Sequence, residues 1–317
     1  MASGEIPAHS PLVLQKPVPD LAPEQFQLFQ ALVLRESGIH LGAKNRAMLV
    51  SRLWKRLRAL ELTSFSSYYR RVKADPQEMV LMLDCICTNE THFFREPAAF
   101  ECLRSRVFPE WLANADARKN GKTLRIWSAA CSTGEEAYSL AMMLLTHFPP
   151  SAGWNLEVLG TDLSTRVLAR ASVAIWQVER ISDVPVEYQR KFLLKGFGPD
   201  KGKIKAVDAL RQIVKFQRLN LSREPYAVTG PFDLIFCRNV LIYFQWETKI
   251  KVVDALGKCL TPNGYLFLGH AESLHGVADR LQTVAPKVFP PLKSPLARGG
   301  ALCILQRREV LSGDRAD

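Results

Sequence analysis

The sequence has 317 residues, 47% of them hydrophobic, and a formal net charge of +11, which predicts a soluble globular enzyme with one large core and a smaller helical one. It contains no run of about 18 apolar residues and no basic-then-apolar start, so we expect neither a membrane span nor an export signal. Its seven scattered cysteines favour neither a disulfide framework nor a metal cluster, which indicates the reducing cytoplasm.

The first part of the chain separates into a lead-in and a helical domain. Residues 1–19 hold four prolines and no periodic pattern, which predicts disorder. From residue 20 to residue 87 we expect a compact helical domain. Two long helices are predicted by "PEQFQLFQALVLRES" and "AKNRAMLVSRLWKRLRALEL", and two shorter ones by "SFSSYYRRVKA" and "PQEMVLMLDCI". In the second long helix, one apolar stripe is formed by Leu49, Leu53, Leu57 and Leu60.

Most of the excess positive charge lies in one segment of this domain, Lys44 to Lys73, which we call the basic stretch. It holds nine Lys or Arg residues against one acid, Glu61, so its net charge is +8. Such a surface can recruit nucleic acid, anionic lipid or an acidic protein. The residues that we expect to dock a partner are Arg52, Lys55, Arg56 and Arg58.

After Cys87 the pattern predicts a doubly wound α/β domain with a parallel sheet, over residues 88–292. Apolar strand-like runs, "TLRIWSAA", "NLEVLGTDLS", "FDLIFCRNVLIYF" and "GYLFLGHAE", alternate with helix-length segments. Three short strand-like pieces around a loop with Gly196, Gly198 and Gly202 predict a small antiparallel sheet inserted at about residues 188–219. The tail, residues 293–317, contains "ALCILQRR", which is either an added edge strand or an interaction peptide.

The loop "SAACSTGEEAYS" follows the first strand and opens a helix, which is where a nucleotide-like ligand approaches backbone amides. It lacks the G-x-G-x-x-G spacing of a dinucleotide site, because only Gly134 is glycine. Glu135 and Glu136 would repel a pyrophosphate, which argues against NAD and for a ligand whose near end is cationic or a hydrogen-bond donor. Both acids also simply favour a helix start, and this alternative stays open.

Three further polar positions follow predicted strands. Asp162 ends the second strand, where an acid accepts hydrogen bonds from both ribose hydroxyls of an adenosine. An acid at a strand end is also often only a helix cap, a role for which Ser164 competes here. Arg238 and Asn239 interrupt an apolar strand at its carboxyl end and therefore predict a site, with Tyr243 four residues later. S-adenosylmethionine fits the sequence better than a phosphate-bearing cofactor, because the loop is poor in glycine and carries two acids at the helix start, and a further acid, Asp162, ends the second strand. The histidines lack ligand spacing, so we expect no metal.

Taken together, the motifs resemble the CheR family of chemotaxis receptor methyltransferases over roughly residues 20–289. The motifs occur in the order "TNETHFFRE", "SAACSTGEEAYS", "TDLS", "RLNL", "GPFDLIFCRNVLIYF" and "LTPNGYLFLGHAES". The resemblance implies a Rossmann-like methyltransferase domain behind an all-helical domain. It also implies transfer of a methyl group from S-adenosylmethionine, leaving S-adenosylhomocysteine, to glutamate side chains of bacterial chemoreceptors for sensory adaptation.

The resemblance also implies roles for individual residues. The positions that match the family's cofactor contacts are Asn89, Thr91, Arg95, Glu135, Asp162, Asn220, Leu221, Arg238 and Asn239. Arg95 and Tyr243 would lie beside the transferred methyl group as catalytic residues. Whether Arg95 pairs with the cofactor's carboxylate, guides the acceptor, or forms a surface ion pair stays open, as does the choice between cap and adenine contact for Asn220.

The partner that the resemblance implies is the acidic helical domain of a chemoreceptor, docked on the basic stretch. A receptor C-terminal peptide at the small inserted sheet is a further candidate, and we expect a monomer that joins membrane-bound receptor arrays from the cytoplasm without inserting into the membrane. Two other functions stay open. One is an S-adenosylmethionine-dependent RNA methyltransferase, although the basic stretch lacks the interleaved aromatics of an RNA surface. The other is a receptor adaptor that holds the cofactor without turnover.

Overall fold

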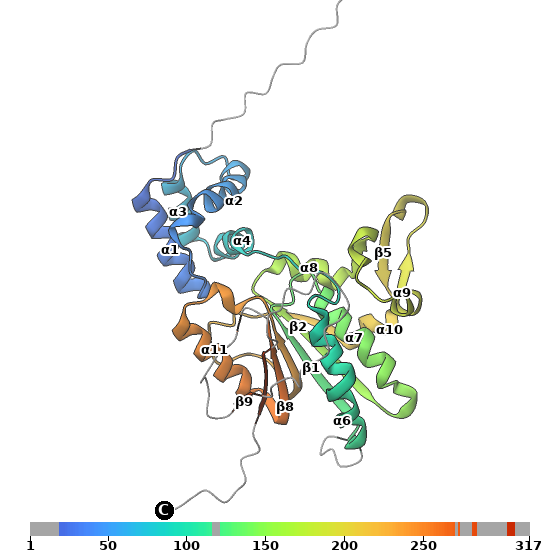
Figure 1. The fold of residues 1–317 in the computed structure, drawn as a ribbon. Helices are drawn as coiled ribbons and strands as arrows, with labels where there is room; N and C mark the ends of the chain where they lie inside the picture. The colour runs from blue at the N-terminus through green and yellow to red at the C-terminus, as the bar shows by residue number, and fades with distance from the viewer. Residues whose placement is uncertain (1–18, 116–120, 270–271, 273–280, 284–302, 308–317) are drawn as a thin grey trace, which may run out of the picture.

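The computed structural model describes residues 19–115, 121–269, 272, 281–283 and 303–307. These residues form a helical domain, a larger domain built on a seven-stranded sheet, and a three-stranded sheet beside it (Figure 1). The helical domain and the three-stranded sheet stand on opposite sides of the same end of the large sheet. Nearly all of the lead-in expected at residues 1–19 lies outside the described residues.

The helical domain consists of α1 (Pro23–Ser37), α2 (Arg46–Ala59), α3 (Phe65–Ala74) and α4 (Pro76–Ile86). Leu49, Leu53 and Leu57 of the expected stripe on α2 are fully buried, because a four-residue spacing keeps them on the face that packs against the other helices. Asp75 caps α4, since its carboxylate accepts hydrogen bonds from the first backbone N–H groups of that helix.

The large sheet has the strand order β6-β2-β1-β7-β8-β10-β9. The pairs between β6, β2, β1, β7 and β8 are parallel, and β10 is antiparallel to both of its neighbours. The bounds of the parallel strands are β1 (Thr123–Ala129), β2 (Asn155–Asp162), β6 (Val214–Arg218), β7 (Phe232–Cys237) and β8 (Leu260–Leu268). Helices lie on both faces of these strands, so the expected Rossmann-like class is confirmed.

The two cores of this domain follow from strand alternation. On β7, Leu234 and Phe236 face a core that includes α5 (Pro97–Cys102), α6 (Phe108–Ala113) and α7 (Glu135–His147), whereas Ile235 and Cys237 face the core beneath α11 (Trp246–Lys258). The remaining helices are α8 (Thr165–Val173), α9 (Val186–Phe192) and α10 (Asp208–Ile213).

The small antiparallel sheet is present, but its boundaries differ from the expected residues 188–219. It is formed by β3 (Ile175–Gln177), β5 (Lys203–Ala206) and β4 (Leu193–Lys195) in that order. The piece "VKFQR" is instead β6, which pairs in parallel with β2 at the edge of the large sheet. The sequence misled here because a short strand does not reveal which distant strand it pairs with.

The tail also differs from both expectations. Cys303–Arg307 forms β10, which lies between β8 and β9 (Leu281–Thr283) and is therefore neither an edge strand nor a separate peptide. Ile304 is buried in one core of the domain and Cys303 and Leu305 in the other, because both faces of the strand are covered. The rest of residues 293–317 lies outside the described residues.

The helical domain is joined to the large domain by backbone contacts next to Gly38. Ile39 forms an isolated β-bridge with Phe244, and the His40 backbone N–H donates to the Tyr243 carbonyl at 2.8 Å. Gly38 has φ 73°, and a Cβ there would lie 2.5 Å from Cβ of Ser222, so both the turn and the close approach require glycine. No helix among the described residues is long and apolar enough to cross a membrane.

A buried ion pair inside the helical domain generates a stability prediction. Glu78 is 3% exposed, and its carboxylate accepts hydrogen bonds from Arg56 Nε at 2.9 Å and from the Tyr68 hydroxyl at 2.9 Å. Glu78→Ala leaves both partners without this acceptor, so we expect the free energy of unfolding to fall by about 3 kcal/mol. Denaturation followed by circular dichroism measures it.

The control is Glu101→Ala, which removes an ion pair with Arg104 whose side chains are 34% and 57% exposed. Such a surface pair contributes less than about 1 kcal/mol. Equal losses in the two variants would show that the Glu78 pair does not act as a buried pair.

Candidate functional site

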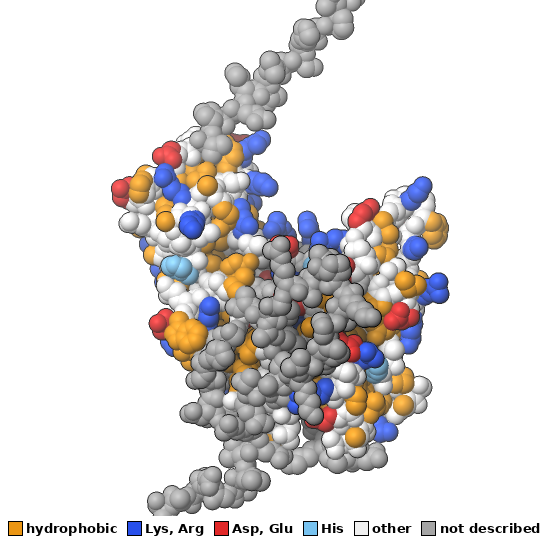
Figure 2. Space-filling model, viewed as in Figure 1, with side chains coloured by type: hydrophobic (Ala, Val, Ile, Leu, Met, Phe, Trp, Pro, Cys, Tyr) orange, Lys and Arg blue, Asp and Glu red, His pale blue; other side chains and the backbone are white. Residues whose placement is uncertain are grey.

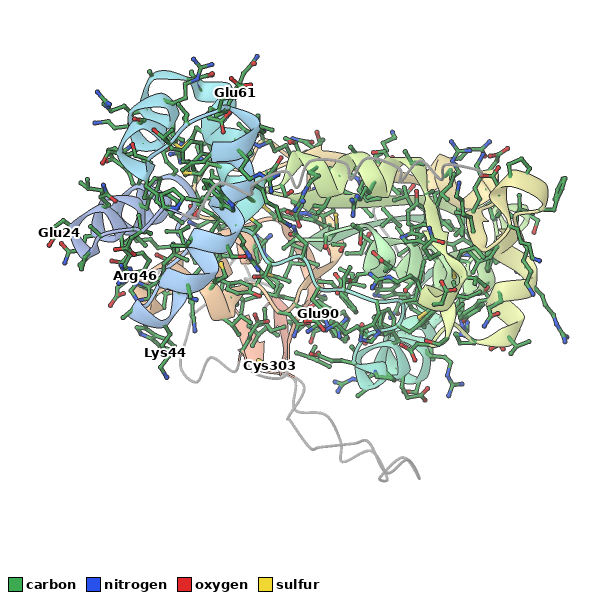
Figure 3. All side chains as sticks on the ribbon, turned by 90° about the horizontal axis from the view of Figure 1, so that it is seen from above. Glu24, Lys44, Arg46, Glu61, Glu90 and Cys303 are labelled. Atoms are coloured by element: carbon green, nitrogen blue, oxygen red, sulfur yellow. The ribbon has the colours of Figure 1, made fainter. Side chains whose placement is uncertain are left out.

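Residues 87–96, which we call the linker, connect α4 to α5. A pocket of about 310 Å³ opens between the helical domain, the linker, and the carboxyl ends of β1, β2 and β7. The linker residue Glu90 lies in the middle of the molecule when it is viewed from above, between the helical domain and the helices of the large domain (Figure 3). The residues expected to bind the cofactor or to act in catalysis that line this pocket are Asn89, Thr91, Arg95, Asp162, Asn220, Leu221, Arg238, Asn239 and Tyr243. Of the expected set, Glu135 alone does not line it.

The linker is held in place by its two phenylalanines. Phe93 packs edge-on against Trp176, and Phe94 stacks on Tyr188, so both rings are buried in the large domain. The backbone N–H of Phe94 donates to Ser139 Oγ on α7 at 3.0 Å. This anchoring places the polar neighbours of the two rings, Asn89, Thr91 and Arg95, along the pocket wall.

Arg95 is half-buried, and its Nη1 donates to the Glu90 carbonyl at 2.8 Å. This bond curls the linker back on itself and holds the guanidinium at the pocket. The sequence left open a surface ion pair of Arg95 with Glu90 or Glu96. Among the described contacts of Arg95, a hydrogen bond to the Glu90 carbonyl is found instead.

The two acids at the start of α7 have different environments. The Glu135 carboxylate is fully buried and accepts hydrogen bonds from Arg180 at 2.7 Å and from Thr133 Oγ1 at 2.6 Å, and it does not line the pocket, so its expected cofactor contact stays a prediction. Glu136 lines the pocket. Successive helical side chains point about 100° apart, which gives these two adjacent residues different surroundings.

A buried arginine links Glu136 to the linker. Arg238 Nη1 lies 3.1 Å from Glu136 Oε2, and Arg238 Nη2 lies 2.9 Å from Glu96 Oε2 and also donates to the Arg95 carbonyl. The arginine side chain is fully buried, and its Nε is a buried donor for which the described residues supply no acceptor. Burial raises the pKa of Glu136, and the charge of Arg238 opposes that rise.

Asp162 ends β2 and faces the pocket with a buried carboxylate. It accepts hydrogen bonds from the backbone N–H of Ser132 and of Ser164, each at 2.9 Å, so it shapes the loop after β1 as well as the start of α8. Burial raises the pKa of Asp162, and these N–H groups oppose the rise because they stabilise the charged form. The α8 cap is provided by Ser164 Oγ, which leaves Asp162 free of that role.

Asn220 is held between the two domains. Its Oδ1 accepts from the backbone N–H and hydroxyl of Ser222, and its Nδ2 donates to the Glu36 carbonyl of α1 at 2.8 Å. The side chain therefore acts as a turn cap and as a tie to the helical domain, while it still lines the pocket beside Leu221.

The four expected docking residues divide into two pairs. Lys55 and Arg58 are exposed. Arg56 is committed to Glu78 at 2.5 Å, and Arg52 donates to the Ile86 carbonyl and to Thr88 Oγ1, so both of these arginines hold the domain together. Their expected part in docking stays a prediction.

Sequence reasoning assigned no role to Glu96 or His40. Glu96 stands next to Arg95, which was singled out, and the buried arginine at 238 was a signal that acids would be needed to balance it. His40 lines the pocket because the turn at Gly38 brings it there, and no sequence pattern marks it.

Among the described residues, no group of three His, Cys, Asp or Glu could hold a metal ion, and the absence of a metal stays a prediction.

Comparison with known families gives two adjoining matches. The family model described as "CheR methyltransferase, all-alpha domain" matches residues 24–87, and "CheR methyltransferase, SAM binding domain" matches residues 89–289. The junction between them falls at the linker that forms one wall of the pocket.

Curated proteins give matches along most of the chain. Chemotaxis protein methyltransferase 2 of Pseudomonas aeruginosa is 35% identical, over 84% of this chain and 93% of its own length. The chemotaxis protein methyltransferase of Escherichia coli K12 is also 35% identical, over 85% of this chain and 91% of its own. Among solved structures, an S-adenosylmethionine-dependent methyltransferase from Mesorhizobium loti overlaps 50% of this chain and 52% of its own at 21% identity, with a TM-score of 0.27.

Proposed function

The chain belongs to the CheR methyltransferase family, and we propose that it transfers a methyl group from S-adenosylmethionine to glutamate side chains on the cytoplasmic helices of bacterial chemoreceptors. The observation that carries the proposal is the pocket between the two matched domains, which gathers eight of the nine expected cofactor residues and Tyr243. The proposed setting is the cytoplasmic side of membrane-bound receptor arrays.

The charges around the pocket fit this cofactor. S-adenosylmethionine carries a positive sulfur, an amino group and a carboxylate, so it needs partners of both signs. Glu136 and Asp162 supply negative charge, and Arg95 supplies positive charge. A pyrophosphate would meet the first two as like charges. The set therefore favours S-adenosylmethionine over a dinucleotide.

Each residue has a proposed task. Asp162 would accept hydrogen bonds from ribose hydroxyls, since it stands at the carboxyl end of β2, the ordinary place for that acid. Asn89, Thr91, Asn220, Leu221 and Asn239 would complete the binding surface around the bound cofactor. Arg95 and Tyr243 would hold the reacting groups in line. Of the earlier alternatives for Arg95, its position at the pocket and its positive charge support contact with a carboxylate, of the cofactor or of the acceptor.

The chemistry requires positioning more than proton transfer. S-adenosylmethionine supplies a methyl group on a positively charged sulfur, which a carboxylate can attack in line. Because a glutamate with a pKa near 4.3 is already ionised at neutral pH, this chain needs no general base. Holding two reactants in line in a closed site contributes on the order of 7–11 kcal/mol to lowering the barrier.

Docking is proposed at two surfaces. Lys and Arg side chains lie along the helical domain and in the notch between it and the three-stranded sheet (Figure 2). Lys55 and Arg58, both on α2 of the helical domain, are exposed and suit acidic receptor helices. The three-stranded sheet exposes Leu194 and, in the following loop, Phe197, which is 88% exposed and suits a receptor C-terminal peptide.

The first test is transfer of radiolabelled methyl groups to membranes that contain receptor, with RNA as a parallel acceptor. We expect base-labile label on receptor protein, and Arg95→Ala should lower transfer at least about 100-fold, by loss of in-line positioning. Label on RNA, or tight cofactor binding without any transfer, would instead support the RNA methyltransferase or the adaptor. Near-wild-type turnover of Arg95→Ala would remove that residue from the reaction.

A second test concerns the ribose contact. Asp162→Asn keeps the shape of the side chain and removes its charge, so affinity for S-adenosylhomocysteine should fall by about 1.5–3 kcal/mol. Calorimetry measures the dissociation constant. The matched control is Asp233→Asn, because Asp233 is equally buried and accepts from the Arg125 backbone N–H, but lies at the opposite end of the sheet. Equal affinity in wild type and Asp162→Asn would rule out the contact.

A third test concerns docking. Lys55→Glu with Arg58→Glu should raise the Michaelis constant for receptor about 10-fold at low salt and leave cofactor affinity unchanged, because only the approach of an acidic surface is opposed. The control reverses Lys122 and Lys251, two exposed lysines of the large domain, which changes the net charge by the same amount. If both pairs act alike, net charge and not a docking surface is responsible.

A further inference from the structure

The segment after Arg238 brings two of the proposed site residues, Asn239 and Tyr243, to the pocket, yet it has little regular structure of its own. Asn239 has a φ of 59°, in the left-handed region that asparagine tolerates better than most residues. It is followed by a single short turn, η7 (Leu241–Tyr243). We call residues 239–243 the pocket loop. Its shape must be fixed by groups outside it.

The buried carboxylate of Glu272 provides this fixation. Its Oε2 accepts hydrogen bonds from the backbone N–H of Asn239 at 3.0 Å and of Gly269 at 2.8 Å, and its Oε1 accepts from the N–H of Ile242 at 3.3 Å. Burial raises the pKa of Glu272, and the Leu241 backbone N–H is one of the groups that oppose this rise. Glu272 is only 4% exposed, and its carboxylate occupies the backbone donors at the start of the pocket loop.

The glycine three residues earlier makes room for this carboxylate. A Cβ at Gly269 would lie 2.8 Å from Glu272 Oε2, 3.0 Å from the Asn239 backbone nitrogen and 3.1 Å from Asn239 Nδ2. Real side chains do not tolerate such approaches without movement, so glycine is needed where the strand end, the carboxylate and the pocket loop meet. This accounts for the glycine and the glutamate of "GHAES", a motif to which methyl transfer assigns no direct role.

A second carboxylate holds the same asparagine from its other side. Asn239 Nδ2 donates to Glu96 Oε1 at 2.9 Å, and Glu96 is itself bound to Arg238. The backbone of Asn239 is therefore tied to Glu272 and its side chain to the linker. If the contact with Glu272 or with Glu96 shifts, the position of Asn239 at the pocket changes, because the described residues supply no other hydrogen-bond partner that would hold it.

We propose that Glu272 is a positioning residue of the methyl-transfer site, whose carboxylate holds the pocket loop so that Asn239 and Tyr243 face the cofactor and the acceptor. Glu272 does not line the pocket and therefore acts through these two residues. The inference rests on the proposed function, since it assigns their tasks from that function. It adds a residue that neither cofactor contact nor catalysis would identify.

The test compares Glu272→Gln with Glu110→Gln by calorimetry with S-adenosylhomocysteine and by thermal unfolding. Glu110 is the matched control, because its carboxylate accepts from the Tyr265 hydroxyl at 2.6 Å in the same domain, away from the pocket. Glu272→Gln replaces one acceptor oxygen of the carboxylate with an NH2 donor, which would face backbone N–H groups. We expect a dissociation constant raised at least 10-fold for Glu272→Gln, and within 2-fold of wild type for Glu110→Gln.

A double-mutant cycle with Asn239→Ala separates positioning from general loosening. If Glu272 acts through Asn239, the double variant should have about the same dissociation constant for S-adenosylhomocysteine as the single variant that binds it less tightly. If the two residues act independently, the fold-changes of the two single variants multiply in the double variant. Gly269→Ala is the second route to the same defect, since its Cβ would displace the carboxylate.

Each outcome decides the matter. A folded Glu272→Gln protein with wild-type affinity, or effects that multiply in the cycle, overturns the proposal. If neither Glu272→Gln nor Gly269→Ala folds, the carboxylate serves folding and the proposal is overturned as well. Failure of the wild type to bind S-adenosylhomocysteine would instead refute the proposed cofactor, which keeps the two failures distinct.

Discussion

The buried charge of Arg238 is the constraint on which the site depends. An arginine side chain with no exposure is tolerated only where anionic partners and hydrogen-bond acceptors surround it, and here Glu96 comes from the linker and Glu136 from the start of α7. One cation therefore fixes three segments that are far apart in the sequence. The pocket forms where they meet, so the cohesion of the fold and the shape of the ligand wall have the same cause.

The same principle extends outward from the arginine. Arg238 binds Glu96, Glu96 binds the side chain of Asn239, and Glu272 binds the backbone of Asn239. Alternating charges and dipoles of this kind satisfy one another in a low-dielectric interior, where an unpaired member would be costly. On the other side, Asn220 and the backbone of His40 join the helical domain to the same region. The linker is thus one of several ties that close the pocket between the domains.

Much of this was predictable, and the failures share a physical reason. Strand alternation and helix period are local, so the helical domain, the parallel strands and the strand-end residues Asp162, Arg238 and Asn239 were found from the sequence. Pairing is not local. The strand Val214–Arg218 joined β2 instead of the small sheet, and Arg56 found Glu78 across 22 residues. The choice between Glu135 and Glu136 depended on one step of helical rotation, which no residue pattern encodes.

The position of β10 has a consequence for shortened forms of the chain. Its neighbours β8 and β9 both precede it in the sequence, and β10 joins them in the sheet. Without β10, the edge of β8 would present unpaired backbone groups. The family match ends at residue 289, so a fragment cut there would lack the strand that pairs with both β8 and β9. Such a fragment would keep every pocket residue and still present an open edge to its neighbours in solution.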